Sequence, residues 1–320
     1  MTEPIPLIWG DKRYYTLNYH LREIFGEKVF KLPLDAGCTC PNRDGSKGWG
    51  GCAFCGLRGA GEHIPGAGLS LTRQMEQGVR QVQKKWQPGR YIAYFQAYTN
   101  TYAPLGRLEQ MYEEALAFPG IVGLAIATRP DCLEPPVLEL LTHFNRRTHL
   151  WIELGVQSSK DSTLTRLHTG YTFDETEKAL QALNVYGIRA CPHVILGLPG
   201  ESKTDALETV KALIGYSLYG IKLQMFHVLK DSELGQLYQA EPFPLLSQDE
   251  YIDWLVSALE LLPPSVVIHR VTGDGPRDTL LAPNWTRDKL RVLSQINQVL
   301  SKQGTWQGRL WHKQTLGQNA

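Results

Sequence analysis

Seven apolar segments, each followed by a helical pattern, constrain the fold of this chain more than any other feature of its sequence. The expected strands cover residues 28–37, 91–98, 120–128, 148–157, 189–198, 220–229 and 265–272, and the expected helices cover 71–86, 106–118, 134–144, 173–187, 202–216, 247–262 and 287–304. Strands that are apolar throughout are typical of a parallel sheet covered by helices. Six to seven such units predict an α/β fold, a partial or full (β/α) barrel rather than an open sheet.

The alternation continues along the chain without an internal repeat or a clear linker, so we expect a single core domain. Residues 28–304 are expected to form this β/α core with a C-terminal extension, residues 1–27 an N-terminal extension, and residues 305–320 a frayed tail. A chain of 320 residues buries enough apolar surface to fold without disulfides.

The N-terminus lacks the basic and apolar regions of a signal peptide, and no segment reaches the roughly 18 apolar residues of a membrane span. We therefore expect a cytoplasmic protein without a membrane partner. Thiols stay reduced in the cytoplasm, so clustered cysteines there indicate metal or redox chemistry. The net charge of +1 neither requires nor excludes an RNA partner, because a basic groove can lie within a neutral total.

Four of the six cysteines, Cys38, Cys40, Cys52 and Cys55, lie in the loop that follows the first expected strand. Thiolates select zinc or iron–sulfur clusters, so the loop predicts a metal centre. One interpretation is a binding protein with a zinc ribbon on an α/β scaffold, in which four thiolates close a tetrahedral site. The other is a reactive iron–sulfur cluster, because chemistry in such barrels gathers at the carboxyl ends of the strands. The single residue between Cys38 and Cys40 favours the cluster, since a zinc knuckle has at least two.

The segment CPNRDG…GGCAFC, residues 40–55, resembles the cluster loop of the radical S-adenosylmethionine (radical SAM) enzymes. Its long gap before the final C-x2-C is similar to that of the YhcC-type bacterial family, which is related to the Elongator catalytic subunit. The resemblance extends over residues 14–300 through later blocks in the same order, YFQAYTNTYAP, TRPDC, ELGVQS, HVILGLPGE and RVTGDGPRD. It implies a β/α barrel of the radical SAM type with an N-terminal iron–sulfur loop.

The resemblance implies that Cys40, Cys52 and Cys55 bind a 4Fe–4S cluster and that S-adenosylmethionine binds its remaining iron. Electron transfer then cleaves the cofactor, and the resulting radical abstracts hydrogen from a substrate. The implied electron donor is a flavodoxin- or ferredoxin-type protein. Kinship with the Elongator subunit makes tRNA or another RNA a candidate substrate, beside a small metabolite.

Two positions depart from the family pattern. Relatives usually have no cysteine at the position of Cys38, which as a fourth ligand would close the cluster and keep the cofactor out. We therefore expect that Cys38 is not a ligand. Thr169 stands where relatives often carry an arginine that meets the cofactor carboxylate, so we expect cofactor binding to differ in detail.

The resemblance also implies cofactor contacts in the cysteine loop and at later strand ends. The expected residues are Phe54 beside the adenine, Thr99 and Asn100 near the amino group, Glu153 or Gln157 at the ribose or methionine, and the backbone of Ile195 to Leu198 at the adenine edge. Each position also has an explanation that involves no cofactor. Phe54 would pack within its loop, Thr99 and Asn100 would form a hydrogen-bonded turn, and residues 195–198 would form a strand-to-helix turn. Glu153 would form a buried ion pair with Arg129 or Lys222.

Late strand ends offer candidates for the substrate side of the barrel. These candidates are His227, His269, Arg270 and Asp274. Asp274 lies between two glycines, which predicts a tight loop with an exposed carboxylate, and a turn or a helix cap is the alternative.

Overall fold

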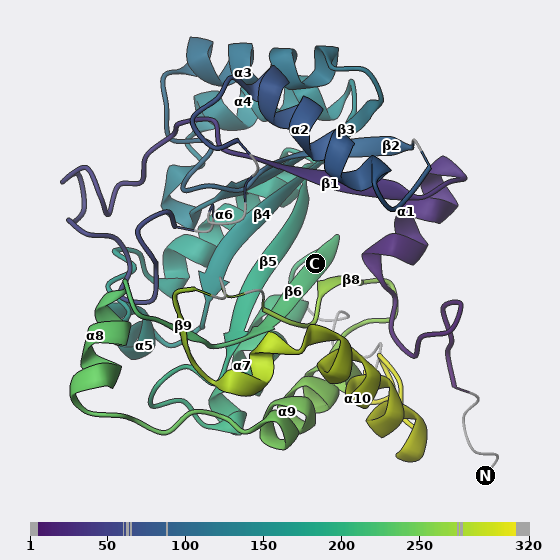
Figure 1. Cartoon of the computed structure of the whole chain (residues 1–320), viewed down its shortest axis with the longest axis vertical. Coiled ribbons are helices and arrows are strands. Elements are labelled where there is room, and N and C mark those ends of the chain that lie inside the picture. Colours follow the sequence, from purple (N-terminus) through teal and green to yellow (C-terminus); the bar gives the residue numbers. More distant parts are fainter. Residues whose placement is uncertain are drawn as a thin grey trace.

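Seven parallel strands form the central sheet, in the order β1-β2-β3-β4-β5-β6-β8. The computed structural model describes residues 6–59, 61, 64, 66–87, 89–273, 275 and 278–311. The strands are β1 (Val29–Leu34), β2 (Arg90–Phe95), β3 (Ile121–Thr128), β4 (His149–Gln157), β5 (Arg189–Leu196), β6 (Gly220–Met225) and β8 (Val267–Arg270). The sheet curls into a partial barrel, and its edges β1 and β8 do not pair with each other among the described residues (Figure 1). The predicted α/β fold is confirmed.

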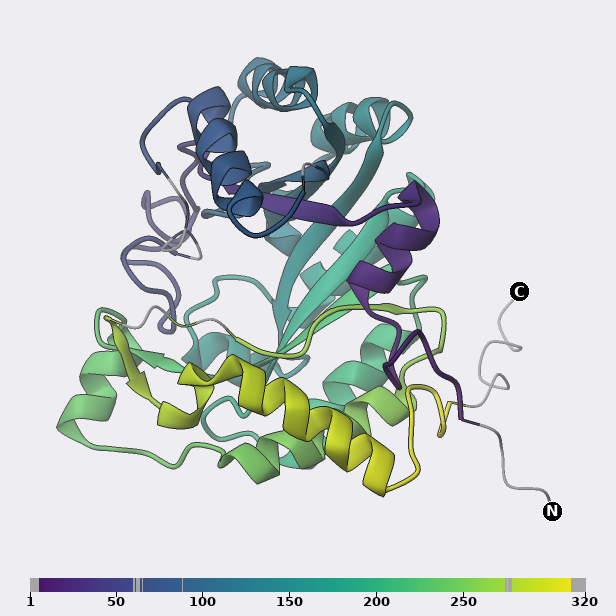
Figure 2. The same ribbon diagram turned by 45° about the vertical axis from the view of Figure 1, so that its right-hand side comes forward.

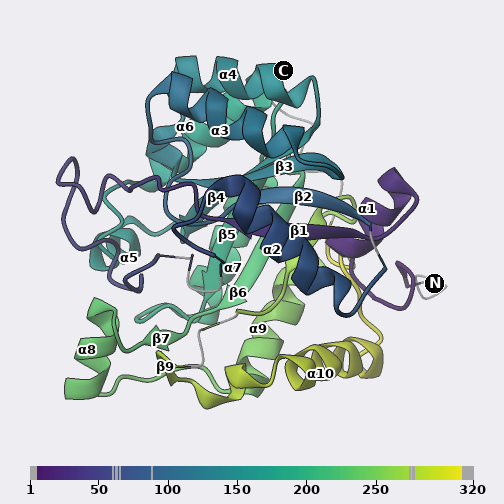
Figure 3. The ribbon, with the colours of Figure 1, turned by 45° about the horizontal axis from the view of Figure 1, so that its top comes forward.

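Helices follow the strands and cover the outer face of the sheet (Figure 3). They are α2 (Leu71–Gln83), α3 (Leu105–Ala117), α4 (Pro135–Asn145), α6 (Phe173–Val185), α7 (Lys203–Ile214), α9 (Gln248–Leu261) and α10 (Lys289–Lys302). All seven agree with expected helices. The main apolar core lies between these helices and the sheet, where Leu32, Ile126 and Leu223 are almost completely buried.

The structure adds elements that the sequence pattern did not predict. They are α1 (Leu17–Phe25), α5 (Asp161–Arg166), α8 (Glu233–Ala240), and the short helical turns η1 (Pro130–Cys132) and η2 (Asn284–Arg287). The expected strand 220–229 is divided, because β7 (Val228–Leu229) leaves the main sheet and pairs antiparallel with β9 (Leu280–Ala282). None of the described helices is long and apolar enough to cross a membrane.

The start and end of the described chain lie together at the β8 edge. Ile268 donates its N–H to the carbonyl of Tyr15 at 2.7 Å, and Tyr15 donates its own to the Gln307 side chain at 2.8 Å. Gln307 is fully buried and donates to the carbonyls of Pro263 and Val266. Thr305, Trp306 and Gln307 are therefore buried, while Arg309 and Leu310 are exposed, and residues 312–320 lie outside the described residues.

The inner face of the sheet is more polar than its apolar sequence segments suggest. Along β4, Ile152 and Leu154 belong to the core beneath the helices, whereas Trp151 and Glu153 face the barrel interior. Successive strand residues point to opposite faces, so this alternation is expected of any strand. The inward side chains that contact Glu153 come from four other strands, as Lys31 of β1, His193 of β5, Lys222 of β6 and His269 of β8.

Candidate metal and cofactor site

A cavity of about 180 Å³ opens at the carboxyl ends of the strands, and Cys40, Cys52 and Cys55 all line it. The loop after β1 carries these cysteines, and a turn in which Cys55 N–H donates to the Cys52 carbonyl brings the last two together. Ala53, inside this turn, donates to the Leu167 carbonyl at 2.9 Å and accepts from the Leu234 N–H at 2.9 Å. Backbone hydrogen bonds to distant parts of the barrel therefore position the loop.

Arg129 brings positive charge to the thiols. Its Nη1 lies 3.8 Å from the Cys40 sulfur, while its Nε and Nη2 donate to the two Asp131 carboxylate oxygens at 2.9 and 2.8 Å. A hydrogen bond from Cys55, together with the Arg129 charge, lowers the pKa of Cys52 to about 7. The same hydrogen bond and burial raise the pKa of Cys55. The cavity therefore favours a thiolate at Cys52, and thiolate is the form that binds metals.

Asn42 fixes the cysteine loop against the segment that contains Thr169. Its side-chain amide donates to the carbonyls of His168 and Thr169 at 2.6 and 2.8 Å, and it lies 3.5 Å from the Cys52 sulfur. Thr169 is completely buried, and its hydroxyl lies within hydrogen-bond distance of two backbone carbonyls. Thr169 therefore supports the loop and is not among the residues that line the cavity.

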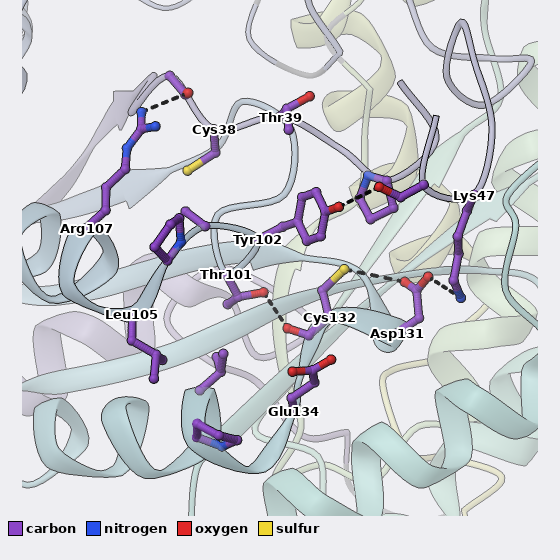
Figure 4. Close-up of a pocket in the computed structure, with 17 residues that line it drawn as sticks. Cys38, Thr39, Lys47, Thr101, Tyr102, Leu105, Arg107, Asp131, Cys132 and Glu134 are labelled. Atoms are coloured by element: carbon purple, nitrogen blue, oxygen red, sulfur yellow. Dashed lines mark hydrogen bonds and ion pairs between the residues drawn. The ribbon is translucent and has the colours of Figure 1, made fainter. Parts of the chain in front are cut away.

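Cys38 lies in a second cavity, which it shares with Cys132 (Figure 4). This cavity has a volume of about 800 Å³ and is formed by the loops after β1, β2 and β3. Burial raises the pKa of Cys38 and also that of Cys132, so both thiols stay protonated at neutral pH. The second cavity is the larger one, but none of the three clustered thiols lines it, so the smaller cavity is the candidate metal site.

The residues expected to contact the cofactor divide into two groups. Those that line the thiol cavity are Phe54, Thr99, Glu153 and Gln157, and those that do not are Asn100, Ile195 and Leu198. The Asn100 amide lies 3.0–3.2 Å from three backbone carbonyls, so this residue forms the turn that was its structural alternative. Ile195 and Leu198 are buried in a small apolar cluster that Phe54 also contacts.

Glu153 lies on the floor of the cavity and also forms the buried ion pair that was its alternative. Its carboxylate contacts the Lys222 ammonium, lies 3.3 Å from Lys31 Nζ and lies 3.1 Å from His193 Nε2. Burial alone would raise the pKa of Glu153, but the charges of Lys222 and Lys31 hold it well below its usual range. Arg129, the other partner considered, pairs with Asp131 instead.

Two cavity residues have a backbone conformation that residues other than glycine rarely adopt. Tyr98 has φ 58° and Gln157 has φ 67°. Such a conformation costs of order 1–3 kcal/mol, persists only where the surroundings fix it, and is concentrated at ligand sites. The Tyr98 hydroxyl donates to the Leu57 carbonyl at 2.9 Å, which ties β2 to the cysteine loop.

None of the described substrate-side candidates lines the thiol cavity. The His269 side chain is completely buried, with one ring nitrogen 3.9 Å from the Glu153 carboxylate. His227 lies against Gly273 and Gly275, and Arg270 is half-buried on β8. Asp274 lies outside the described residues.

The cavity also contains polar residues that the sequence patterns did not single out. They are Arg43, Tyr94, Tyr171, His193 and Gln224, and they lie beside Gln96 and beside Arg129, which was considered only as a partner of Glu153. The sequence held one signal that could have identified some of these residues. Tyr94 and Gln96, like Lys222 and Gln224, are polar residues two positions apart in otherwise apolar segments, and residues two apart on a strand point to the same face of the sheet.

Known proteins match this chain over most of its length. The profile of the Radical SAM superfamily matches residues 40–213, and that of the Radical_SAM C-terminal domain matches residues 218–302. The uncharacterized protein YtqA of Bacillus subtilis is 41% identical over 97% of this chain and 96% of its own length, and YhcC of Escherichia coli (strain K12) is 35% identical over 90% and 93%.

Among solved structures, the archaeal Elp3 of Methanocaldococcus infernus with an N-terminal deletion has a TM-score of 0.66 and 18% sequence identity. The match covers 87% of this chain and 64% of that chain, so this chain spans less than two thirds of the archaeal protein. This likeness supports the fold.

Proposed function

The chain belongs to the radical SAM superfamily, in the YhcC-type group related to the Elongator catalytic subunit, and from this premise we propose its activity. We propose that Cys40, Cys52 and Cys55 hold a 4Fe–4S cluster and that S-adenosylmethionine binds in the same cavity. When bound, these groups supply the reductive cleavage of the cofactor and a radical that removes hydrogen from the substrate. The observation that carries the proposal is that three thiols line one cavity and the other three cysteines do not.

The arrangement of the thiols supports a cluster over a single zinc ion. Three cysteine thiols, those of Cys40, Cys52 and Cys55, line the thiol cavity. A structural zinc site needs four ligands, and Cys38 lies in the second cavity. A 4Fe–4S cluster instead distributes its thiolate ligands over separate irons. Three thiols on one cavity therefore suit a cluster with one iron left without a protein ligand.

The chain's own side chains would bind and orient these groups. Arg129 and Arg43 offset the negative charge of three thiolates. Gly51 has φ 97°, and a Cβ at this position would come within 2.9 Å of the Arg43 guanidinium. Glycine at position 51 therefore avoids a steric clash with the Arg43 side chain. Glu153 stays ionised beside Lys222 and would accept hydrogen bonds from hydroxyl groups of the cofactor, while Phe54 would offer an apolar face to its adenine.

The test is anaerobic reconstitution of the full chain with iron and sulfide, followed by reduction with a flavodoxin- or ferredoxin-type donor or with dithionite. We expect a brown protein with four irons per chain that cleaves S-adenosylmethionine to methionine and 5′-deoxyadenosine. A colourless protein that carries one zinc and cleaves no cofactor would overturn the proposal in favour of the zinc-ribbon alternative. The need for reduced thiols is consistent with a cytoplasmic location.

For the substrate, we propose a nucleotide within an RNA, because an exposed aromatic side chain stands on the cysteine loop. Trp49 lies between Cys40 and Cys52 in the sequence, and 79% of its surface is exposed. Its ring lies against Gly45, where any side chain would collide with it. Stacking of a base on such a ring contributes about 1–3 kcal/mol.

The RNA proposal is tested by titration of the full chain with unfractionated tRNA. Trp49→Ala is expected to weaken binding about tenfold, as the loss of one stacked base predicts. Trp86→Ala is the matched control, because Trp86 is 51% exposed but follows α2, where its ring contacts Phe30 and Lys28 rather than the cysteine loop. Equal binding by all three proteins would contradict an RNA substrate stacked on Trp49.

A further inference from the structure

A column of aromatic rings runs from the barrel interior to the surface at the amino ends of the strands. The ring column consists of Trp151, Tyr219, His20, Tyr15 and Trp9, in this order. The centroids of consecutive rings lie 6.0, 5.3, 5.4 and 5.7 Å apart. Trp151 is completely buried on β4, whereas Tyr15 and Trp9 are half-buried in the N-terminal segment. Figure 2 shows α1 and this segment on the side of the barrel away from the cysteine loop.

Three oxidisable rings of the column, Trp151, Tyr219 and Tyr15, each have a hydrogen-bond partner that can accept a proton. The pairs are Trp151 Nε1 with Glu153 at 3.1 Å, the Tyr219 hydroxyl with His149 Nε2 at 3.0 Å, and the Tyr15 hydroxyl with Glu23 at 2.9 Å and His20 Nδ1 at 2.8 Å. A tyrosine or tryptophan that loses an electron becomes a strong acid. An acceptor within hydrogen-bond distance takes the proton and returns it when the electron returns, so these pairs suit reversible one-electron oxidation.

The histidines of this region are neutral and can accept such a proton. Burial lowers the pKa of His149 to about 4 and that of His269 to about 3. The His269 ring contacts both Trp151 and Tyr219, with centroids 5.5 and 5.4 Å away. A positively charged imidazole here would make one-electron oxidation of the neighbouring rings less favourable, whereas a neutral imidazole does not.

Glu153 connects the inner end of the ring column to the thiol cavity. It lines the cavity floor and accepts the hydrogen bond from Trp151. Tyr94 also lines the cavity, and its hydroxyl lies 3.0 Å from Lys222 Nζ, which contacts Glu153 in turn. A radical formed in the cavity would therefore stand next to one hydrogen-bond network that includes Trp151.

We propose that the ring column is a one-electron path that quenches a radical left in the cavity without a substrate. This inference rests on the proposed function. The carbon radical gains an electron from Trp151 and a proton through Glu153, which forms one C–H bond. Tyr219 and then Tyr15 reduce the ring before them. Each tyrosine passes its proton to its acceptor and regains it when it is reduced, and one proton from solvent replaces the proton that left Trp151. A thiol in solution reduces the tyrosyl radical at Tyr15 and ends as half of a disulfide.

The first test needs no cofactor and isolates the path itself. The full chain is oxidised in air by a photogenerated ruthenium(III) complex, and oxygen addition at the buried Trp151 is measured by mass spectrometry. We expect Tyr15→Phe to lower Trp151 oxidation at least fivefold. Tyr216→Phe is the matched control, because Tyr216 is also half-buried and donates to a glutamate, Glu177, but stands outside the column. Equal oxidation of Trp151 in all three proteins would overturn the proposal.

The second test asks whether the path protects the enzyme. The reconstituted, reduced enzyme is given S-adenosylmethionine without substrate, and cofactor cleavages are counted until activity is lost. Tyr219→Phe is expected to survive at least fivefold fewer cleavages than the wild type and Tyr216→Phe. Equal survival would contradict the protective role. Absence of cleavage in every protein would contradict the proposed function instead, while the first test would still decide whether the path exists.

Discussion

The two ends of the barrel interior use the same strands for different purposes. On β4, Trp151 at the amino end contacts other rings, Glu153 in the middle is held in an ion pair, and Gln157 at the carboxyl end lines the thiol cavity. The carboxyl end combines thiols, cations and unusual backbone conformations around open space. The amino end is filled by rings and neutral histidines. Position along the inner face of a strand therefore decides whether a polar residue faces a ligand or a closed interior.

The largest contrast is expected for the cysteines of the two cavities. Cys40→Ala, Cys52→Ala and Cys55→Ala are each expected to abolish iron binding and cofactor cleavage, because each removes one of only three thiols on the cavity. Cys38→Ala is expected to stay within about twofold of the wild type in both measurements, because it removes a thiol from the second cavity. Loss of the cluster in Cys38→Ala and its retention in Cys40→Ala would reverse the assignment.

Glu153 at the boundary between the two ends is expected to control stability. Glu153→Gln leaves Lys222 and Lys31 without their carboxylate, and breaking a buried ion pair in this way costs about 3–5 kcal/mol. Urea unfolding of the metal-free chain measures this loss. A second change, Lys222→Met in the same chain, should restore more than half of it, because it removes the unpaired buried charge. A loss below about 1 kcal/mol would show that water reaches the pair.

The neutral histidines at the amino end predict how stability depends on pH. The pKa of His269 is about 3 in the folded chain and about 6.5 in the unfolded chain, so only the unfolded chain gains its proton as pH falls below 6.5. The contribution of His269 to stability is therefore complete above pH 6.5 and is lost as pH falls toward 3. Between pH 6 and 4, His269→Asn should reduce the slope of unfolding free energy against pH by about 1.4 kcal/mol per unit. An unchanged slope would mean that His269 is protonated in the fold.

The smallest expected effect concerns the tie between β2 and the cysteine loop. Tyr98→Phe removes the hydrogen bond to the Leu57 carbonyl, and such a bond contributes about 0.5–1.5 kcal/mol. We expect a loss of that size in urea unfolding, together with a lower affinity for iron as the loop becomes less ordered. Tyr216→Phe is the control, because its hydroxyl donates to Glu177 and, among the described residues, makes no contact with the cysteine loop. Equal iron affinity in both variants would show that the hydrogen bond from Tyr98 to the cysteine loop does not affect metal binding.

Much of the fold could be predicted from the sequence because it depends on local patterns. Apolar strands and amphipathic helices recur at regular intervals, and the cysteine loop follows the first strand. The division of the cysteines between two cavities could not be derived from spacing, because Cys38 and Cys40 are only two positions apart. Asn100 and Thr99 are adjacent, yet one supports a turn and the other lines the cavity.

The contacts of Glu153 were predicted only in part, because its partners come from distant parts of the sequence. Lys222 was one of the two expected partners, but Lys31 was not expected, since it meets Glu153 only when β1 curls toward β4 and no local pattern encodes that curvature. The position of α1 was missed for a similar reason, since the short helix is held at the sheet edge by contacts with β1 and β8. Long-range packing, rather than propensity, decides these positions.

The central claim is that three thiols hold a cluster with one iron open to a ligand. The most direct measurement is electron paramagnetic resonance of the reduced, reconstituted protein before and after S-adenosylmethionine is added, for the wild type and for Cys38→Ala. We predict a reduced cluster whose spectrum changes in the same way in both proteins, because the cofactor binds an iron that no cysteine occupies. A cluster spectrum that the cofactor leaves unchanged in the wild type but alters in Cys38→Ala would show that Cys38 closes the site, and would contradict the account.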